Sequence, residues 1–596
     1  MSGERLSTAG RVAGPRRGTG WAWRTWRTWR TWLAAAVLLA AHVGLAVSSL
    51  AVKSVTNDEL AHLPAGLAAV ATGELRLNPE HPPLVKLLAG LAASTLHPDL
   101  PLNGRAYREG NEWGFGRRVF FESGNDPRAL LFRGRLPIVA LSVLGGLGVF
   151  LWSRRRFGAG GGLLSLALYA FSPTVLAHGR LVTMDAAVAA GTVWTLYLVW
   201  RARPPASGAP PLRRLAVRSG ACGLALGLTL AAKFSGLILL PALALADLGA
   251  FGVRVRSVWR ERLVRWGVML PVAALVVAAF YAGGGGLLRY VRDLGHLYGE
   301  NDPNALYYLG GRFRHGSFPE YFLVALAVKT SLAGLLAMAG GLALAGRALA
   351  RRAPRWRDDL YLWVPAAVWL AVHSAFALDL GVRYDLPLYP LLFVLAGGLV
   401  PAVAAAVGGA GSGRLAVVLP VAVTALLGLA QLSTALGAHP DYLPFFNRLV
   451  GGERGGLRWL DDSNLDWGQD LARLAPWLAA RGIGRVRLLY YGAGVPSAYG
   501  VEREPMLASD WLQTPRPGVY VVSAEYLIRG LHQAETAEVA SDWLRRYRPS
   551  DVLGGTLYLY RFRASSLPAE DRQQEQAGQA ERSGRPGEVE GPAVDP

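Results

Sequence analysis

The sequence predicts an α-helical polytopic membrane protein of about eleven transmembrane helices, with a small outer α/β domain at the carboxyl end. Of its 596 residues, 52% are hydrophobic and only 17% are charged, a composition typical of membrane proteins rather than of one soluble domain. An apolar run of about 20 residues can cross a bilayer as a helix. The expected spans are 32–52, 136–153, 161–178, 181–200, 217–232, 234–251, 266–283, 320–346, 360–378, 385–407 and 415–436.

The arginines predict how these spans are oriented. They gather in alternate loops, at 24–30, 154–156, 201–214, 254–262 and 351–355. Because cytoplasmic loops of membrane proteins are enriched in Lys and Arg, we expect these loops inside, in a multi-pass protein of the plasma membrane. The loop 53–135, the turn 178–180, the loop 284–319 and the chain after 437 are then extracytoplasmic. The net charge of +20 therefore reflects topology, and no nucleic-acid partner is expected.

The two ends of the transmembrane unit have distinct compositions. Residues 1–31 form a basic cytoplasmic amino terminus, in which the Trp-Arg-Thr repeat at 23–32 indicates an interfacial anchor. A nucleic-acid patch would have a similar composition, and a cleaved signal peptide at 32–52 is a second alternative. The single cysteine, Cys222, excludes an intramolecular disulfide.

The transmembrane unit covers 32–436, and its first outer loop, 53–135, is expected to be structured. Leu60 to Thr72 and Pro83 to Thr95 predict two short helices that lie flat on the outer surface and roof a cavity. In the outer domain, 437–563, we expect strands at 486–491 and 518–523 and helices at 466–481 and 535–547, an alternation typical of α/β folds. The polar tail 564–596 is expected to be disordered.

Two acidic positions stand at the outer ends of apolar stretches. Asp58 and Glu59 follow the first span, and Asp185 begins the fourth. A carboxylate near hydrocarbon costs several kcal/mol, roughly 2.5 to 3.5 on insertion scales, so such a residue is usually functional. Asp58 could simply cap the helix that starts at Leu60. A helix amino terminus also keeps a carboxylate ionised, as a general base requires.

Cations accompany these acids at the same face. Lys233, at the outer end of the fifth span, is expected to pair with Asp185, because each is costly alone near hydrocarbon. Lys329 and the Arg383-Tyr384 pair add positive charge, which suits a phosphate group in an apolar groove. Glu80 and His81 stand before two prolines, at a rigid corner where His81 could contact a phosphate or a hydroxyl. Each of these groups has a purely structural alternative, a turn or an ion pair.

At these motifs the chain resembles the GT-C superfamily of membrane glycosyltransferases, in the protein O-mannosyltransferase-like branch (glycosyltransferase family 39). The resemblance spans roughly 32–440 and continues into a tail seen in bacterial members. It is carried by Asn57-Asp58-Glu59, Glu80-His81-Pro82-Pro83-Leu84, His178-Gly179-Arg180 through Asp185, Tyr321-Phe322 with Lys329-Thr330, Gly381-Val382-Arg383-Tyr384, Leu386 to Pro390, His439 to Asn447 and Asp462 to Asp470.

The resemblance implies transfer of a sugar from a polyprenyl phosphate to a hydroxyl on the outer face, with inversion. Asp58 and Glu59 are the implied catalytic residues, with Asp58 as the general base. The donor and its phosphate would contact Glu80, His81, Arg180, Asp185, Lys233, Lys329, Arg383 and Tyr384. His81 stands where relatives can carry a lysine. The β-trefoil domain of eukaryotic O-mannosyltransferases has no counterpart here, so the acceptor stays open among protein, lipid and cell-envelope glycan.

Other classes share part of this pattern. No His/Cys cluster has zinc spacing, so no metal ligands are predicted, although a divalent cation bridging Asp58 and the phosphate is compatible with the sequence. A secondary transporter should show internal repeats and charges near the midplane. A polysaccharide ligase or polymerase that uses a pyrophosphate carrier should favour arginines in large outer loops. A scaffold that binds partners through 437–563 is the non-enzymatic alternative.

Overall fold

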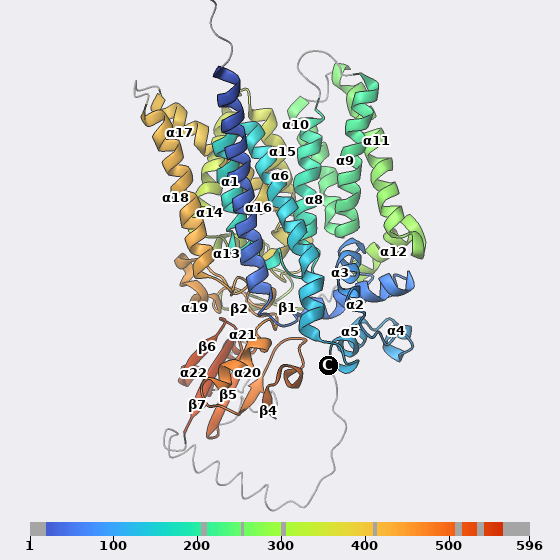
Figure 1. Ribbon diagram of the computed structural model, residues 1–596, viewed down its shortest axis with the longest axis vertical. Helices are drawn as coiled ribbons and strands as arrows, with labels where there is room; N and C mark the ends of the chain where they lie inside the picture. The colour runs from blue at the N-terminus through green and yellow to red at the C-terminus, as the bar shows by residue number, and fades with distance from the viewer. Residues whose placement is uncertain are drawn as a thin grey trace, which may run out of the picture.

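A computed structural model describes residues 19–203, 211–251, 256–299, 305–408, 414–506, 515–532 and 542–563. A bundle of long helices occupies one part of the molecule, and a layer of short helices and a small sheet cover one end of it (Figure 1). We call this covered end the domain end. The polytopic α-helical fold predicted from the sequence, with a small sheet region at the carboxyl end, is confirmed. The tail 564–596 and residues 1–18 lie outside the described residues.

Eight described helices are long and apolar enough to cross a membrane. They are α1 (Thr19–Leu50), α6 (Pro127–Ala170), α9 (Leu212–Ala232), α11 (Arg256–Phe280), α14 (Leu332–Ala350), α15 (Trp356–Phe376), the pair α16 (Leu388–Ala396) and α17 (Leu399–Gly408), and α18 (Leu415–Gly437). Helix α1 begins well before residue 32, so the Trp-Arg-Thr repeat continues the first span as helix.

Helix α6 is two antiparallel arms rather than one rod. Gly158 has a φ of 80° and interrupts the helix, a conformation that glycine adopts without strain. The Ser165 hydroxyl donates to Ser153 at 2.8 Å, and the Tyr169 hydroxyl donates to the Ser142 carbonyl at 2.9 Å. Residues 27 apart would lie about 40 Å apart along a straight helix. The two arms therefore match the separate spans predicted at 136–153 and 161–178.

Two shorter segments complete the bundle, α8 (Asp185–Arg201) and Phe234–Ala250, which contains η2 (Phe234–Ile238) and most of α10 (Leu239–Phe251). With the second arm of α6 and the eight long helices, they make eleven helical segments of the bundle among the described residues. Helix α7 (Pro173–His178) precedes α8, and α13 (Tyr321–Lys329) precedes α14. The outer turn predicted at 178–180 is seen between α7 and α8.

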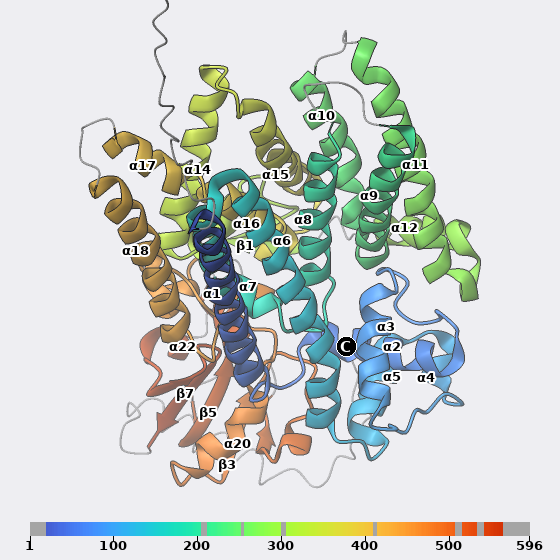
Figure 2. The same ribbon diagram turned by 45° about the horizontal axis from the view of Figure 1, so that its top comes forward.

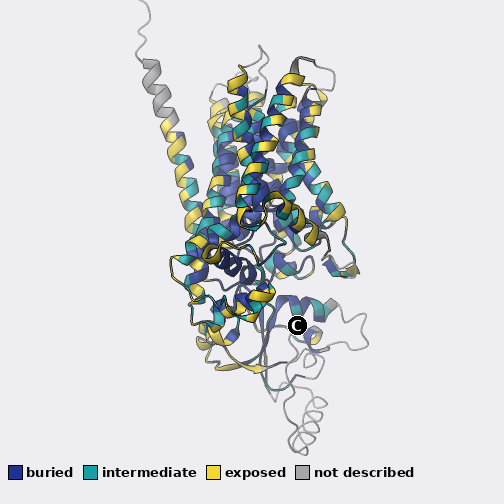
Figure 3. Ribbon diagram, turned by 90° about the vertical axis from the view of Figure 1, so that its right-hand side faces the viewer, coloured by how far each residue is buried: buried dark blue, intermediate teal, exposed yellow. Residues whose placement is uncertain are grey.

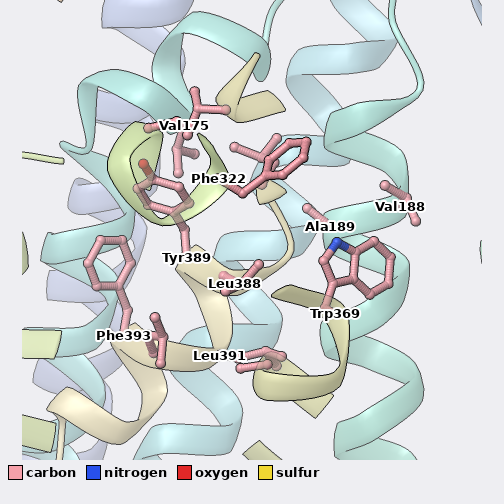
Figure 4. Packing of buried hydrophobic residues seen from close by; sticks show 14 of the residues in the cluster. Val175, Val188, Ala189, Phe322, Trp369, Leu388, Tyr389, Leu391 and Phe393 are labelled. Carbon is pink, nitrogen blue, oxygen red and sulfur yellow. The ribbon is translucent and has the colours of Figure 1, made fainter. Parts of the chain in front are cut away.

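The bundle core is formed by aromatic and aliphatic side chains from α7, α8, α13, α15 and α16. Phe322, Trp369, Tyr389 and Phe393 pack with small residues of α8 such as Ala189 (Figure 4). Colouring by burial shows the same contrast, with buried residues inside the bundle and exposed ones on its outer surface (Figure 3). The exposed side chains include leucines and valines, as expected for a surface that faces lipid.

The first loop folds into a compact layer at the domain end. It contains α2 (Asn57–Thr72), α3 (Leu84–Ser94), α4 (Arg105–Glu109), α5 (Glu112–Arg117) and η1 (Arg118–Glu122). Residues 59–69 of α2 are all buried, with α3 and α5 packed against the helix, so α2 is an internal part of this layer. Helices α2 and α3 cross at Gly66 and Gly90, where an added Cβ on Gly90 would lie 2.3 Å from Gly66 carbonyl carbon.

Short connecting elements lie at the domain end of the bundle, some beside the first-loop layer and some between the bundle and the sheet (Figure 1). They are η3 (Ala282–Gly284), α12 (Gly286–Gly299), the hairpin of β1 (Leu306–Leu309) and β2 (Arg312–His315), η4 (Val382–Asp385), η5 (Arg448–Val450), α19 (Gly452–Gly456) and η6 (Asp462–Asn464). Helix η4 joins α15 to α16, and η6 stands at the start of the carboxyl-terminal segment that reaches the first loop. These elements carry several of the residues described below.

The carboxyl-terminal domain is a five-stranded mixed sheet in the order β4-β3-β5-β7-β6. Its strands are β3 (Arg485–Leu489), β4 (Glu502–Pro505), β5 (Gly518–Ser523), β6 (Asp551–Leu553) and β7 (Leu557–Phe562). Helices α20 (Leu471–Ala479), α21 (Ala524–His532) and α22 (Asp542–Arg546) and the turn η7 (Pro496–Tyr499) accompany it. Figure 2 shows α20 and α22 beside strands β3, β5 and β7. The predicted helix at 466–481 begins only at Leu471, and most of the one predicted at 535–547 lies outside the described residues.

Candidate active site at the domain end

Asp58 stands in the first turn of α2, where the chain enters the layer below the bundle. Thr56 caps this helix and forms a capping box with Glu59, whose carboxylate accepts from the Thr56 amide at 3.1 Å. Asp58 Oδ2 accepts a hydrogen bond from Arg383 Nη1 at 2.5 Å, and the Asp58 side chain remains 20% exposed. Asp58 is thus a positioned carboxylate that a solvent-borne hydroxyl can reach.

Glu59 has entirely different surroundings. It is fully buried, and its carboxylate accepts hydrogen bonds from Arg135 Nε at 2.8 Å, from Arg135 Nη2 at 2.6 Å and from the Val182 amide at 2.9 Å. Burial acts to raise the pKa of Glu59, but Arg135 outweighs it and the pKa is lowered. Glu59 therefore holds α2 against α6 and the 178–184 turn. These contacts give Glu59 a positioning role, and the catalytic role that the resemblance implied for it stays a prediction.

Arg383 lies on η4, between α15 and α16, and contacts Asp58 from there. Its guanidinium carbon lies 4.3 Å from the Trp467 ring centroid and 5.2 Å from the Tyr384 ring centroid. Burial acts to lower the pKa of Arg383, but Asp58 and neighbouring acidic groups raise it overall. The buried Nε has no hydrogen-bond partner. Arg383 is therefore a permanent cation with one donor still available.

Asp185 and Lys233 form the predicted pair. Lys233 Nζ donates to Asp185 Oδ1 at 2.6 Å, and both residues are buried. The same ammonium lies 4.4 Å from the Tyr384 ring centroid, which links this pair to the Asp58–Arg383 pair. Asp185 Oδ2 has no hydrogen-bond partner. The predicted proximity of Asp185 and Lys233 is confirmed, and the pair borders the candidate site.

The turn between α7 and α8 contributes two buried polar side chains without partners. His178 Nδ1 and Arg180 Nε and Nη1 are buried and make no hydrogen bond. The pKa of Arg180 falls to about 10, because burial and then the neighbouring Arg135 disfavour its charge. A buried guanidinium with unused donors is an anion-binding group. This is the strongest sign of a ligand site among the residues that the sequence singled out.

The two predicted site residues at the Pro-Pro corner, Glu80 and His81, have different surroundings. The His81 ring lies 4.9 Å from that of His62, and burial, the neighbouring histidine and Lys233 hold the pKa of His81 well below its usual value. Glu80 instead shares Asn78 with Glu112: Asn78 Nδ2 donates to each carboxylate at 2.9 Å. His81 therefore faces the candidate site as a neutral imidazole, and Glu80 belongs to a neighbouring polar cluster.

Lys329 lies near enough to His178 to interact with it electrostatically, but its hydrogen bonds go to the carboxyl-terminal segment. Its ammonium donates to the Leu443 carbonyl at 2.7 Å and to the Asn464 carbonyl at 2.6 Å, and it lies 4.2 Å from the Phe446 ring centroid. These contacts occupy the lysine with the carboxyl-terminal segment. The sequence shows a cation at a helix end but not that backbone carbonyls from 114 and 135 residues away would surround it.

The 461–470 segment is the main feature that the sequence interpretation missed. The Val382 amide donates to Asn464 Oδ1 at 2.9 Å, the Ser54 amide to the Gln469 carbonyl at 2.9 Å and the Asn57 amide to the Trp467 carbonyl at 3.3 Å. One segment thus fixes both η4 and the entrance to α2. Its Asp462 lies near Arg383 and Asp58, and burial raises the Asp462 pKa to about 7. The motif was visible in the sequence but was assigned to a helix of the outer domain.

Lys86 and Glu112 were also missed. Lys86 Nζ donates to the Asn78 and His81 carbonyls, the latter at 2.8 Å, and burial lowers its pKa to about 8. Burial and then the nearby Glu80 raise the pKa of Glu112 to about 7. A lysine in an apolar helix, Leu84 to Ser94, was the available signal. Within the described ranges, no three His, Cys, Asp or Glu side chains are arranged to hold a metal ion.

Comparison with known proteins now adds sequence evidence. Residues 129–281 match the family described as dolichyl-phosphate-mannose-protein mannosyltransferase. Over this range the match supports the resemblance to protein O-mannosyltransferase-like membrane glycosyltransferases. The matched range covers about a quarter of the chain and includes Arg135, Arg180, Asp185 and Lys233, but neither Asp58 nor Arg383. No curated protein matches the chain significantly.

Solved structures resemble the chain at low sequence identity. ArnT from Cupriavidus metallidurans in the apo state is 14% identical, over 88% of this chain and 97% of that chain, with a TM-score of 0.49. The same protein bound to undecaprenyl phosphate is 15% identical, over 91% and 98%, with a TM-score of 0.46. AglB from Archaeoglobus fulgidus, in complex with an inhibitory peptide and a dolichol-phosphate, is 12% identical, over 91% and 75%, with a TM-score of 0.48.

Proposed function

We propose that this protein is a membrane glycosyltransferase that moves a sugar from a polyprenyl-phosphate donor to an acceptor hydroxyl. The observation that carries the proposal is the Asp58–Arg383 pair, a partly exposed carboxylate in contact with a buried guanidinium. Next to it lie further cationic or polar groups, namely Lys233, Arg180, His178 and His81. A base that water can reach, beside buried cations, suits a polar acceptor and an anionic lipid donor.

The reaction needs one base and positive charge. The acceptor oxygen attacks the anomeric carbon, the bond between that carbon and the phosphate oxygen breaks, and the hydroxyl proton passes to Asp58. The prenyl phosphate departs with the electron pair, and the single displacement inverts the anomeric centre. General base catalysis typically contributes about 10²–10⁴-fold. Because a phosphate monoester is a good leaving group, the site needs cations more than a strong general acid.

Arg383 couples the two halves of this reaction. While Asp58 is ionised, it occupies one donor of Arg383, and the Arg383 Nε stays available. When Asp58 takes the acceptor proton, its negative charge disappears and the full charge of Arg383 faces the departing phosphate. Tyr384 and Trp467 flank the guanidinium and keep it in place. The leaving phosphate is thus stabilised as the proton is transferred.

Arg180 and His178 are the proposed contacts for the donor phosphate. Both are buried at the end of α7, and both keep polar atoms without protein partners. Asp185 and Lys233 border this place, with the Asp185 Oδ2 open for a sugar hydroxyl. In this arrangement the prenyl chain lies against the apolar bundle while the sugar reaches Asp58.

The proposed working face is extracytoplasmic. The domain end carries the first loop, the carboxyl-terminal domain and every proposed site residue. The arginines at 154–156, 201–203, 260–265 and 351–355 lie at the turns and helix ends of the opposite end (Figure 1). Cytoplasmic ends of membrane proteins are enriched in such residues, so the domain end is assigned to the outside.

The test is donor turnover by the purified full-length protein in liposomes. Polyprenyl phosphates that carry different hexoses or pentoses are supplied with a cell-envelope fraction as acceptor, and release of free prenyl phosphate is measured. Asp58→Asn should lower turnover by about 10² or more, while donor binding remains. Asp99→Asn, which neutralises an exposed carboxylate of the same loop, is the control and should be unchanged. Equal turnover of the two variants would refute the role of Asp58.

A further inference from the structure

A surface cavity remote from Asp58 lies where the bundle meets the carboxyl-terminal domain. It has a volume of about 840 Å³ and is formed by the β1–β2 hairpin, the start of α13 and the 448–459 segment. Its charged lining residues are Arg312, Arg454 and Arg458 against a single carboxylate, Glu320. None of these arginines makes an ion pair with a carboxylate of the described residues. The cavity is therefore strongly cationic.

The rest of the lining is apolar and continuous with the lipid-facing surface. Leu309, Val324, Val450 and Trp459 form its apolar part, together with Leu449, which is 75% exposed. Leu323, the neighbour of Val324 on α13, is 58% exposed on the outside of the bundle. Exposed leucines beside arginines at a helix end are typical of the boundary between hydrocarbon and headgroups.

The cavity is also preformed, because its three walls are joined by hydrogen bonds. The Gly310 amide donates to the Trp459 carbonyl at 3.1 Å, and the Tyr308 hydroxyl donates to the Leu457 carbonyl at 2.7 Å. Asn447 donates through its amide to Val328 at 2.9 Å and through Nδ2 to Thr330 at 2.9 Å. These bonds fix the backbone of the hairpin, of α13 and of 448–459 relative to one another, and the three exposed arginines project from this frame.

We propose that this cavity binds the phosphate headgroup of an anionic membrane lipid, whose acyl chains lie along α13. Three guanidinium groups on a fixed frame match the charge and hydrogen-bonding geometry of a phosphate. Basic pockets between membrane helices are suited to anionic lipid headgroups. The apolar wall that leads from Leu449 to Leu323 accommodates the chains, which a soluble phosphate lacks. The lipid would thereby link the hairpin and the 448–459 segment to the bilayer.

The experiment measures phosphatidylglycerol bound to the delipidated full-length protein by native mass spectrometry. Arg454→Gln with Arg458→Gln should lower occupancy by about tenfold or more. The matched control, Arg485→Gln with Arg503→Gln, removes two exposed arginines from the sheet and should leave it unchanged. Phosphatidylcholine at the same concentration should occupy the site much less, and added salt should release phosphatidylglycerol.

Three results would overturn the proposal. They are equal occupancy in both double variants, equal binding of phosphatidylcholine and phosphatidylglycerol, and equal competition by inorganic phosphate, which would mean an anion site without lipid selectivity. Arg312→Gln alone, on the hairpin wall, gives an independent variant should the double variant fold poorly. Donor turnover through Asp58 is measured separately, so either proposal can fail without the other.

Discussion

Asp58 and Glu59 are adjacent in sequence but differ in what they can do. Asp58 is partly exposed beside Arg383, whereas Glu59 is fully buried with Arg135 and a backbone amide. Because the two side chains leave a helix about 100° apart, one points to the rim and the other to the interior. Their neutral variants should therefore separate chemistry from folding.

Glu59→Gln is expected to destabilise the protein by several kcal/mol. The substitution leaves the buried Arg135 guanidinium without its counter-charge, and breaking a buried ion pair typically costs about 3–5 kcal/mol. Thermal unfolding of the purified protein, compared with Asp58→Asn, gives the measurement. A Glu59→Gln variant that keeps its melting temperature but loses turnover would instead make Glu59 a catalytic residue.

Asp185 and Lys233 are expected to be strongly coupled. Either single alanine substitution leaves a buried charge without its partner, while the double substitution removes both. The double variant should therefore lose less stability than the sum of the singles, with a coupling of about 0.5–3 kcal/mol. Unfolding midpoints of the wild type, the two single variants and the double variant give the double-mutant cycle. Stability losses that simply add would contradict a direct interaction.

Glu112 should make the stability of the protein fall as pH rises from about 4.5 to 7. Its pKa is raised to about 7 in the folded protein, so the folded state holds the proton more tightly than the unfolded state. This stabilisation is complete below the unfolded pKa and is lost as pH passes the folded pKa. Glu112→Gln should flatten this part of the melting-temperature profile. Lys86, with a pKa of about 8, titrates at higher pH.

At the scale of elements, the crossing of α2 and α3 sets where Asp58 stands. The two helices meet through Gly66 and Gly90, whose backbones are in direct contact. Helix α2 is consequently buried on most sides rather than lying on the surface. The sequence indicated both helices, with bounds close to those observed, but not that glycines would draw them together. Amphipathic patterns describe one helix at a time, whereas a crossing depends on two.

Gly90→Ala is expected to destabilise this layer. Its Cβ would lie 2.3 Å from the Gly66 carbonyl carbon, so the helices must separate, and overpacking of this kind typically costs about 1–3 kcal/mol. Gly44→Ala on α1, where an added Cβ meets nothing within 4 Å, should be neutral or slightly stabilising. Melting temperatures of the two variants test this prediction, and equal values would contradict the close approach of Gly66 and Gly90.

Across the whole molecule, the apolar runs of the sequence predicted the helices of the bundle well. Each of the eleven expected spans coincides with a described helical segment, and the two arms of α6 account for two of them. Asp185 and Lys233 could be paired because each is too costly alone. Lys329, Arg383 and the 461–470 segment could not be placed in the same way. Their contacts join residues far apart in sequence, and no local pattern encodes such distances.

The orientation of the whole bundle gives a further prediction. A reporter that is active only outside the cytoplasm, fused after Arg563, should be active, because the carboxyl-terminal domain shares the domain end with Asp58. A second fusion at residue 354, in the arginine-rich turn between α14 and α15, should be inactive and serves as the control. Activity of a cytoplasm-only reporter after Arg563 would reverse the proposed face.

The attachment of the 461–470 segment has a consequence for biosynthesis. A ribosome that has made residues 1–437 has produced every helix of the bundle and the Asp58–Arg383 pair, but not the segment whose backbone and side chains fix η4 and the entrance to α2. Only when about thirty more residues have emerged do the Asn464 and Trp467 contacts form. Since chains are made from the amino terminus onward, a nascent or prematurely ended protein can insert into the bilayer while its reactive centre stays unassembled. The complete site therefore forms only after the helices of the bundle have been made.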